Sequence, residues 1–172
     1  MAIPQRVYLI GFMGSGKSTL GKKMANKLGY HFVDTDKLIE QKHTLSIHEI
    51  FKQYGEAYFR EQETLVLNST LNMDKVIVST GGGLPCYHNN IDTIINAGMS
   101  IYLKGDPLFL KNRLLPNQAN RPLIEGLTDN ELYQYVEKKL MERESFYNKA
   151  HYHVDLPIKS LETLLKSAGL AI

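Results

Sequence analysis

One stretch near the start of the chain, Gly11–Ser18, constrains the fold more than any other. It reads Gly-Phe-Met-Gly-Ser-Gly-Lys-Ser and fits G-x-x-x-x-G-K-[ST], the pattern of a phosphate-binding loop (P-loop). A short apolar run, Val7–Ile10, precedes it, and apolar residues recur at every fourth position over Thr19–Leu28. The loop is therefore expected between a buried strand and an amphipathic helix, the context that this motif requires.

Each part of the motif has a role in holding phosphate groups. The glycines let the backbone bend tightly and bring its N–H groups against phosphate oxygens. The N-terminus of the following helix adds a partial positive charge. The Lys17 ammonium can reach the β- and γ-phosphates of a nucleotide, and the Ser18 hydroxyl can ligate Mg²⁺.

Composition narrows the class of protein. The 172 residues are 43% apolar and 22% charged, which suits one domain with a sizeable core, over residues 1–172. The net charge is only +2 and the basic residues are spread out, so we expect neither nucleic acid nor a membrane as partner. A single cysteine, Cys86, excludes an internal disulfide. We expect a cytoplasmic protein that acts as a monomer.

Strand patterns alternate with helix patterns along the chain. Further strands are expected at His31–Val33, Lys75–Ser79, Met99–Leu103 and His151–Val154. Ser46-x-x-Glu49 and Thr128-x-x-Glu131 are capping boxes, and each predicts the start of a helix. The first of these helices should end before Gly55, with another over Glu56–Leu71. The alternation predicts an α/β fold with a parallel sheet covered on both faces.

Three loops should meet at one edge of this sheet, because ligands of such sheets bind beyond the carboxyl ends of the strands. They are the phosphate loop, Asp34–Asp36 and Gly81–Gly83. An extended backbone would point Asp34 and Asp36 to the same side, with Asp34 the best available carboxylate for Mg²⁺. The alternative is that one of the two aspartates only caps the next helix.

The glycine run and two arginines suggest a place for the second substrate. Gly81–Gly83 would let a ligand approach the backbone closely, although the same run could be a flexible turn into the next helix. Arg60 and Arg143 each lie on an apolar helix face, where a charge requires a partner. That partner is either a structural carboxylate or the carboxylate of a substrate held by a bidentate contact.

A polar segment with two prolines, residues 116–126, reads as a long surface loop of the length that often serves as a lid. Pro122 should hold Arg121 in an extended conformation. From there Arg121 could close over a transferring phosphate, and Arg113 is in a similar position. The alternative for both is an ordinary solvated surface arginine.

These motifs, in this order, resemble the shikimate kinase family. The likeness runs from about Arg6 to His153 and is carried by Gly11–Thr19, Asp34–Asp36, Phe59–Arg60 with Glu63, Ser79–Gly83, Arg121–Leu123, and Arg143 with Tyr147. It implies a three-layer P-loop kinase fold with a five-stranded parallel sheet in the order 2-3-1-4-5 and a lid loop. Residues 34–60 would form the shikimate-binding region and residues 112–126 the lid.

The resemblance also implies a reaction: transfer of the γ-phosphoryl group of ATP, with Mg²⁺, to the 3-hydroxyl of shikimate, a step of aromatic amino-acid biosynthesis. Asp36, Lys17 and Arg121 would be catalytic. The residues that it implies for ATP are Gly14, Ser15, Gly16, Lys17, Ser18, Thr19, Arg113 and Arg121. Those for shikimate are Asp36, Arg60, Gly81, Gly82, Gly83 and Arg143, and those for the metal are Ser18 and, through water, Asp34.

Two other functions stay open on the sequence. The first is another small-molecule kinase of the same fold, with gluconate as the nearest carboxylated polyol. The second is a nucleotide-binding regulator without catalysis. The glycine run beside Arg60 and Arg143 favours the rigid shikimate ring over gluconate, and intact Lys17, Ser18 and Asp36 argue against the regulator.

Overall fold

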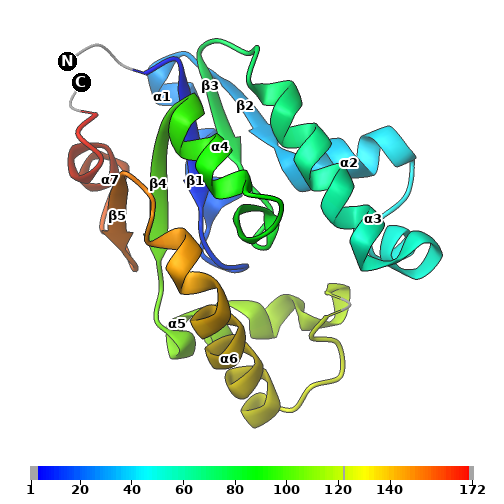
Figure 1. Ribbon diagram of the computed structural model, residues 1–172. Coiled ribbons are helices and arrows are strands. Elements are labelled where there is room, and N and C mark those ends of the chain that lie inside the picture. The colour runs from blue at the N-terminus through cyan, green and yellow to red at the C-terminus, as the bar shows by residue number, and fades with distance from the viewer. Residues whose placement is uncertain (1–3, 122, 171–172) are drawn as a thin grey trace.

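Five parallel strands form the centre of the computed structural model, which describes residues 4–121 and 123–170. They are ordered β2-β3-β1-β4-β5 (Figure 1). Their bounds are β1 Arg6–Ile10, β2 His31–Asp34, β3 Val76–Ser79, β4 Met99–Lys104 and β5 Tyr152–Asp155. Register places Leu9 beside Ser79 on one side and Ile101 on the other, so the strands end at a common edge. The predicted parallel sheet and its strand order are confirmed.

Helices follow the strands as the sequence predicts. They are α1 Lys17–Leu28, α2 Thr35–His43, α3 Ile47–Thr70, α4 Asn90–Ala97, α5 Pro107–Leu114, α6 Asp129–Tyr147 and α7 Leu161–Ser167, with short 3₁₀ helices η1 Leu84–Cys86 and η2 Leu115–Asn120. Both capping boxes are present at the starts of α3 and α6. Gly55 has φ 83° and ψ 173°, so α3 is interrupted where the sequence predicts a helix end.

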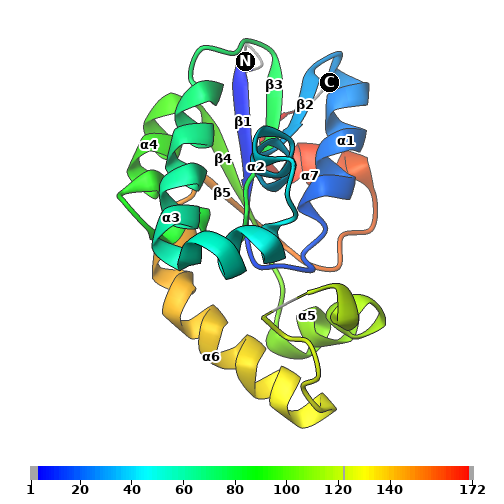
Figure 2. The same ribbon diagram turned by 90° about the vertical axis from the view of Figure 1, so that its right-hand side faces the viewer.

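The sheet is covered on both faces because its strands are apolar on both sides. Tyr8 and Ile10 of β1 point into a core shared with α3, α4 and α6. Val7 and Leu9, which alternate with them, point into a second core with α1 and α7. Figure 2 shows α1 and α7 on one side of the sheet and α3 and α4 on the other, which gives three layers.

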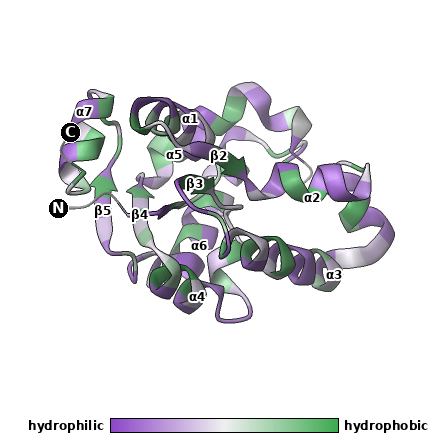
Figure 3. Cartoon of the chain, turned by 90° about the horizontal axis from the view of Figure 1, so that it is seen from above, coloured by the Kyte–Doolittle hydropathy of each residue, from purple (hydrophilic) through white to green (hydrophobic). Residues whose placement is uncertain are grey.

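A third, smaller core lies outside the β2 edge of the sheet. Ile39 of α2 packs there with Ile50, Phe59 and Val66 of α3. Figure 3 shows α2 and the neighbouring part of α3 projecting beyond β2, with hydrophobic and hydrophilic positions alternating along both helices. This amphipathic pair forms one wall beside the carboxyl edge of the sheet.

The lid segment differs from the prediction. Its first part is not an irregular loop, because Leu115–Asn120 forms η2, with Asn117 outside helical angles (φ −121°, ψ 22°). Arg121 is extended as expected (φ −126°, ψ 100°), whereas Pro122 lies outside the described residues. In the part of the chain that the structure describes, every helix is too short or too polar to cross a membrane.

Candidate functional site

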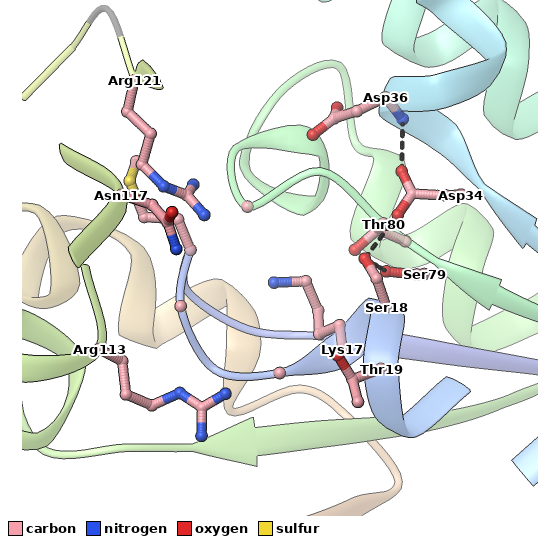
Figure 4. Close-up of a pocket in the computed structure, with 14 residues that line it drawn as sticks. Lys17, Ser18, Thr19, Asp34, Asp36, Ser79, Thr80, Arg113, Asn117 and Arg121 are labelled. Atoms are coloured by element: carbon pink, nitrogen blue, oxygen red, sulfur yellow. Dashed lines mark hydrogen bonds between the residues drawn. The ribbon is translucent and has the colours of Figure 1, made fainter. Parts of the chain in front are cut away.

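A pocket of about 390 Å³ opens at the carboxyl edge of the sheet, where the three predicted loops meet. The side chains reach it from two sides: Asp34 and Asp36 face Arg113, Asn117 and Arg121, and Lys17 lies between them (Figure 4). Predicted residues that line the pocket are Gly14, Gly16, Lys17, Ser18, Thr19, Asp34, Asp36, Gly82, Arg113 and Arg121. The convergence of segments far apart in the sequence follows from the strand order.

The phosphate loop adopts the strained geometry that its glycines permit. Gly14 and Gly16 have φ values of 79° and 92°, which other residues rarely adopt. Lys17 Nζ donates to the carbonyls of Gly11 (2.7 Å) and Phe12 (2.8 Å), so the loop curls around the ammonium. Burial lowers the Lys17 pKa to about 8, although Asp36 and Asp34 oppose this shift. Lys17 thus supplies a concentrated positive charge at the pocket floor.

Asp34 has two roles at once. Its Oδ1 accepts from the backbone N–H groups of Asp36 (3.1 Å) and Lys37 (3.3 Å), which caps α2. Its Oδ2 accepts from the Ser18 hydroxyl at 2.6 Å, and Ser79 Oγ lies 3.3 Å from the same hydroxyl. The predicted alternatives of cap and pocket carboxylate are therefore both realised by one side chain.

Asp36 lies in the first turn of α2, so the extended backbone expected for it is wrong. A helical turn brings it into the pocket instead. Burial and the nearby charge of Asp34 raise the Asp36 pKa to about 6, against the opposing charge of Lys17. A carboxylate of this kind is a suitable acceptor for a hydroxyl proton.

The glycine run is packed against functional side chains and is not a flexible turn. A Cβ on Gly81 would lie 2.6 Å from Asp36 Oδ1 and 2.8 Å from Glu63 Oε1, and one on Gly83 would collide with the Arg60 guanidinium. Gly81 N–H donates to the Thr35 hydroxyl at 2.9 Å. The close approach predicted for a ligand is thus made first by the protein's own carboxylates and arginine.

Arg60 and Arg143 do not line this pocket but lie next to Gly83 and Gly82. Arg60 has the structural carboxylates that one alternative predicted: Nη1 donates to Glu63 at 2.7 Å, and Nη2 to Glu56 at 2.9 Å. Arg143 is 8% exposed, and its guanidinium lies 5.4 Å from the centre of the Phe12 ring. Two buried arginines therefore flank the glycine run.

Glu63 is the most buried carboxylate near the pocket, with 1% of the residue exposed. Burial raises its pKa to about 7, in spite of the opposing Arg60 charge. Neighbouring Asp36 pushes the pKa in the same direction as burial. The region beyond Asp36 therefore titrates as a group of linked charges.

Four pocket residues were not predicted: Met13, Ser79, Thr80 and Asn117. Ser79 and Thr80 had a usable signal, because polar residues directly after the apolar run of β3 must lie at the carboxyl edge. Met13 is inside the motif but at a variable position. Asn117 had no signal, since it reaches the pocket only through the fold of η2. Conversely, Ser15, Gly81 and Gly83 were predicted and do not line the pocket.

The donor atoms fit a magnesium ion. Ser18 and Asp34 place a hydroxyl and a carboxylate oxygen together, and Mg²⁺ prefers oxygen ligands and usually keeps several waters. Among residues 4–121 and 123–170, no group of three or more His, Cys, Asp or Glu side chains could hold a metal ion by itself. The fit rests on the Ser18–Asp34 pair.

Comparison with known proteins points in one direction. Residues 13–166 match the family described as shikimate kinase. A shikimate kinase of Bacteroides fragilis is 38% identical over 147 residues, covering 86% of this chain and 82% of that protein. The crystal structure of shikimate kinase from Bacteroides thetaiotaomicron superposes with a TM-score of 0.89 at 34% identity, covering 95% of this chain and 97% of that one. Shikimate kinase from Acinetobacter baumannii in complex with shikimate gives 0.85 at 31%, covering 94% and 89%.

Proposed function

The chain belongs to the shikimate kinase family, and we propose that it transfers the γ-phosphoryl group of ATP to the 3-hydroxyl of shikimate, giving ADP and shikimate 3-phosphate. One observation carries the proposal: Lys17, Asp36 and Arg121 line the same pocket. A phosphate donor, a proton acceptor and a charge-neutralising arginine are therefore within one small volume. The reaction requires little more of the protein than positioning and electrostatic stabilisation.

On the nucleotide side, the backbone N–H groups of Gly14 to Thr19 would surround the phosphates, and Lys17 would contact the β- and γ-phosphates. Ser18 and, through water, Asp34 would hold Mg²⁺, which neutralises phosphate charge when bound. Arg121 would offset charge that develops on the transferring group. Arg113, whose guanidinium lies alongside Gly16, would contact the nucleotide at the pocket mouth.

On the acceptor side, Asp36 would hold ring hydroxyls and take the proton of the attacking 3-hydroxyl. Its pKa of about 6 leaves it mostly ionised at neutral pH, while desolvation makes it a better acceptor than an exposed aspartate. Arg60 and Arg143 would bind the shikimate carboxylate on either side of the glycine run. Gly82 N–H would donate to the substrate, while Gly81 N–H is already bonded to Thr35.

We further propose that one domain carries both sites, with residues 34–60 as the shikimate-binding region and residues 112–126 as the lid. Every residue given a role comes from a single chain, which supports activity as a monomer. The single cysteine supports a reducing, cytoplasmic setting.

The test is an ADP-release assay of the pure protein with ATP and Mg²⁺, run in parallel with shikimate and with gluconate. We expect turnover with shikimate and a phosphomonoester on its 3-oxygen by ³¹P NMR. Turnover with gluconate alone would replace the substrate. Tight binding of ATP and Mg²⁺ without transfer to either acid would favour a non-catalytic regulator.

A further inference from the structure

The ring of Tyr87 lies over the guanidinium of Arg60. Arg60 Cζ is 4.3 Å from the ring centre, the shortest cation–π distance in the part of the chain that the structure describes. The Arg60 side chain is 7% exposed, whereas Tyr87 is 37% exposed. Tyr87 is therefore placed between a buried guanidinium and the solvent.

The hydroxyl of Tyr87 reaches the same carboxylate that holds Arg60. Glu56 Oε1 accepts from Tyr87 Oη (3.3 Å), Arg60 Nε (3.2 Å) and Arg60 Nη2 (2.9 Å). Glu63 accepts from Arg60 Nη1 at 2.7 Å. Two carboxylates fix the edges of the guanidinium, and the Tyr87 ring fixes its face.

The loop that carries Tyr87 is held in place independently of any ligand. His88 and Asn89, which follow it, both have left-handed backbone angles (φ 50° and 56°), a conformation that costs free energy outside glycine. Asn90, 1% exposed, donates from its backbone to Tyr87 O (2.9 Å) and from its side chain to Thr64 of α3 (3.1 Å). The loop is thus tied to the helix that bears Arg60.

We propose that Tyr87 is a positioning residue for the substrate carboxylate: it keeps the Arg60 guanidinium in the orientation that binds this group together with Arg143. The inference rests on the proposed function. An arginine whose orientation is fixed in advance loses less conformational entropy when it binds. Because the carboxylate is not the reacting group, Tyr87 contributes to the affinity for shikimate and not to turnover.

The first experiment compares Tyr87→Leu and Tyr87→Phe with the wild-type protein in steady-state assays. Tyr87→Leu should raise the KM for shikimate by about 3- to 30-fold, the range expected for loss of a cation–π contact. Tyr87→Phe keeps the ring and should retain most of the affinity. Both should leave kcat and the KM for ATP within about twofold. Equal shikimate KM values in all three proteins would overturn the proposal.

Tyr133→Leu is the matched control. Its hydroxyl also donates to a glutamate, Glu137, at 3.3 Å, but on α6 and away from Arg60. We expect its kinetic constants to equal those of the wild type. A rise in shikimate KM equal to that of Tyr87→Leu would mean that loss of any such tyrosine has the effect, and the proposal would fall.

The second experiment asks whether Tyr87 acts through Arg60. Calorimetry would give the shikimate Kd of Tyr87→Leu, Arg60→Lys and the double variant. In the Arg60→Lys protein, removing Tyr87 should change Kd by less than about twofold, because contacting residues are not additive. Fully additive effects would show that Tyr87 acts by another route and would overturn the positioning role.

A third measurement separates this inference from the proposed function. The Arg60 Nε–H resonance, assigned with Arg60→Lys, should move in Tyr87→Leu without any substrate, because the aromatic ring shields protons over its face. An unmoved resonance would contradict the stacking. A wild-type protein that does not phosphorylate shikimate would contradict the proposed function, and the resonance would still decide whether Tyr87 orients Arg60.

Discussion

Asp36 shows how a single side chain can be placed for chemistry at a cost in stability. Its carboxylate is desolvated and lies near Asp34, and both effects raise its pKa to about 6. The charged form that would accept a proton is therefore the form that the folded protein holds less well. Lys17 and Arg60 reduce this cost without removing it.

The sign of the resulting pH dependence is fixed. The folded pKa of about 6 is above the ordinary value of 3.8, so between these values the folded state binds more protons than the unfolded state. Asp36 therefore lowers the free energy of unfolding as pH rises toward about 6, and the loss persists at pH 7. We expect Asp36→Asn to raise this free energy by about 1–3 kcal/mol at pH 7.5 and by less at pH 5.

Urea unfolding of both proteins at the two pH values measures this difference. Asp74→Asn, at an aspartate whose side chain is 76% exposed, is the control and should change stability little at either pH. An Asp36→Asn protein that is less stable than the wild type at pH 7.5 would contradict the desolvation of Asp36.

Residue-level prediction from the sequence worked where chemistry follows from a local pattern. Lys17 and Ser18 were found from their motif alone. Arg60 was placed on its helix face, and Glu56 and Glu63 are four residues before it and three after it, within reach on a helix. Tyr87 could not be found, because its position over Arg60 depends on a loop whose left-handed residues, His88 and Asn89, are not glycines.

At the scale of elements, the N-terminus of α2 joins folding to the site. Asp34 caps the helix with one oxygen and accepts from Ser18 with the other. The two roles can be separated because asparagine caps helices about as well as aspartate but lacks the charge.

We therefore expect Asp34→Asn to keep its thermal stability but to need about 10-fold more Mg²⁺ for half-maximal activity, a loss typical of an outer-shell ligand. Asp34→Ala should show the same Mg²⁺ dependence and also lose about 1 kcal/mol of stability. Thermal melts and Mg²⁺ titrations of the kinase reaction measure both quantities.

Asp106 provides the control, since it caps α5 by accepting from Phe109 N–H at 2.9 Å. Asp106→Ala should lower stability like Asp34→Ala and leave the Mg²⁺ titration unchanged. If Asp34→Asn titrates with Mg²⁺ like the wild type, Asp34 has no part in holding the metal.

Element boundaries were predictable where capping residues mark them, as at Ser46 and Thr128, or where glycine interrupts a helix, as at Gly55. The lid was not predictable in the same way. Residues 115–120 lack an apolar period, yet Gln118 donates from its side chain to the carbonyls of Ile124 and Leu127 at 2.7 Å each. A side-chain bond across the segment orders it, and no local propensity reports such a bond.

At the scale of the whole molecule, strand order creates the site. Placing β1 between β3 and β4 brings the phosphate loop beside the segments that follow β2 and β3. The alternation of strands and helices was sufficient to predict this edge. It could not predict which side chains fill the space, because Asn117 and Thr80 reach the pocket through tertiary packing.

The most direct test of the central claim compares shikimate-dependent ADP release by the wild type and Asp36→Asn, at saturating ATP, Mg²⁺ and shikimate, alongside the Kd for ATP. Loss of a general base typically costs 10²–10⁴-fold, so we expect kcat to fall by about that factor. The Kd for ATP should stay within about twofold, because the phosphate loop is intact. An Asp36→Asn protein that phosphorylates shikimate at the wild-type rate would contradict the account.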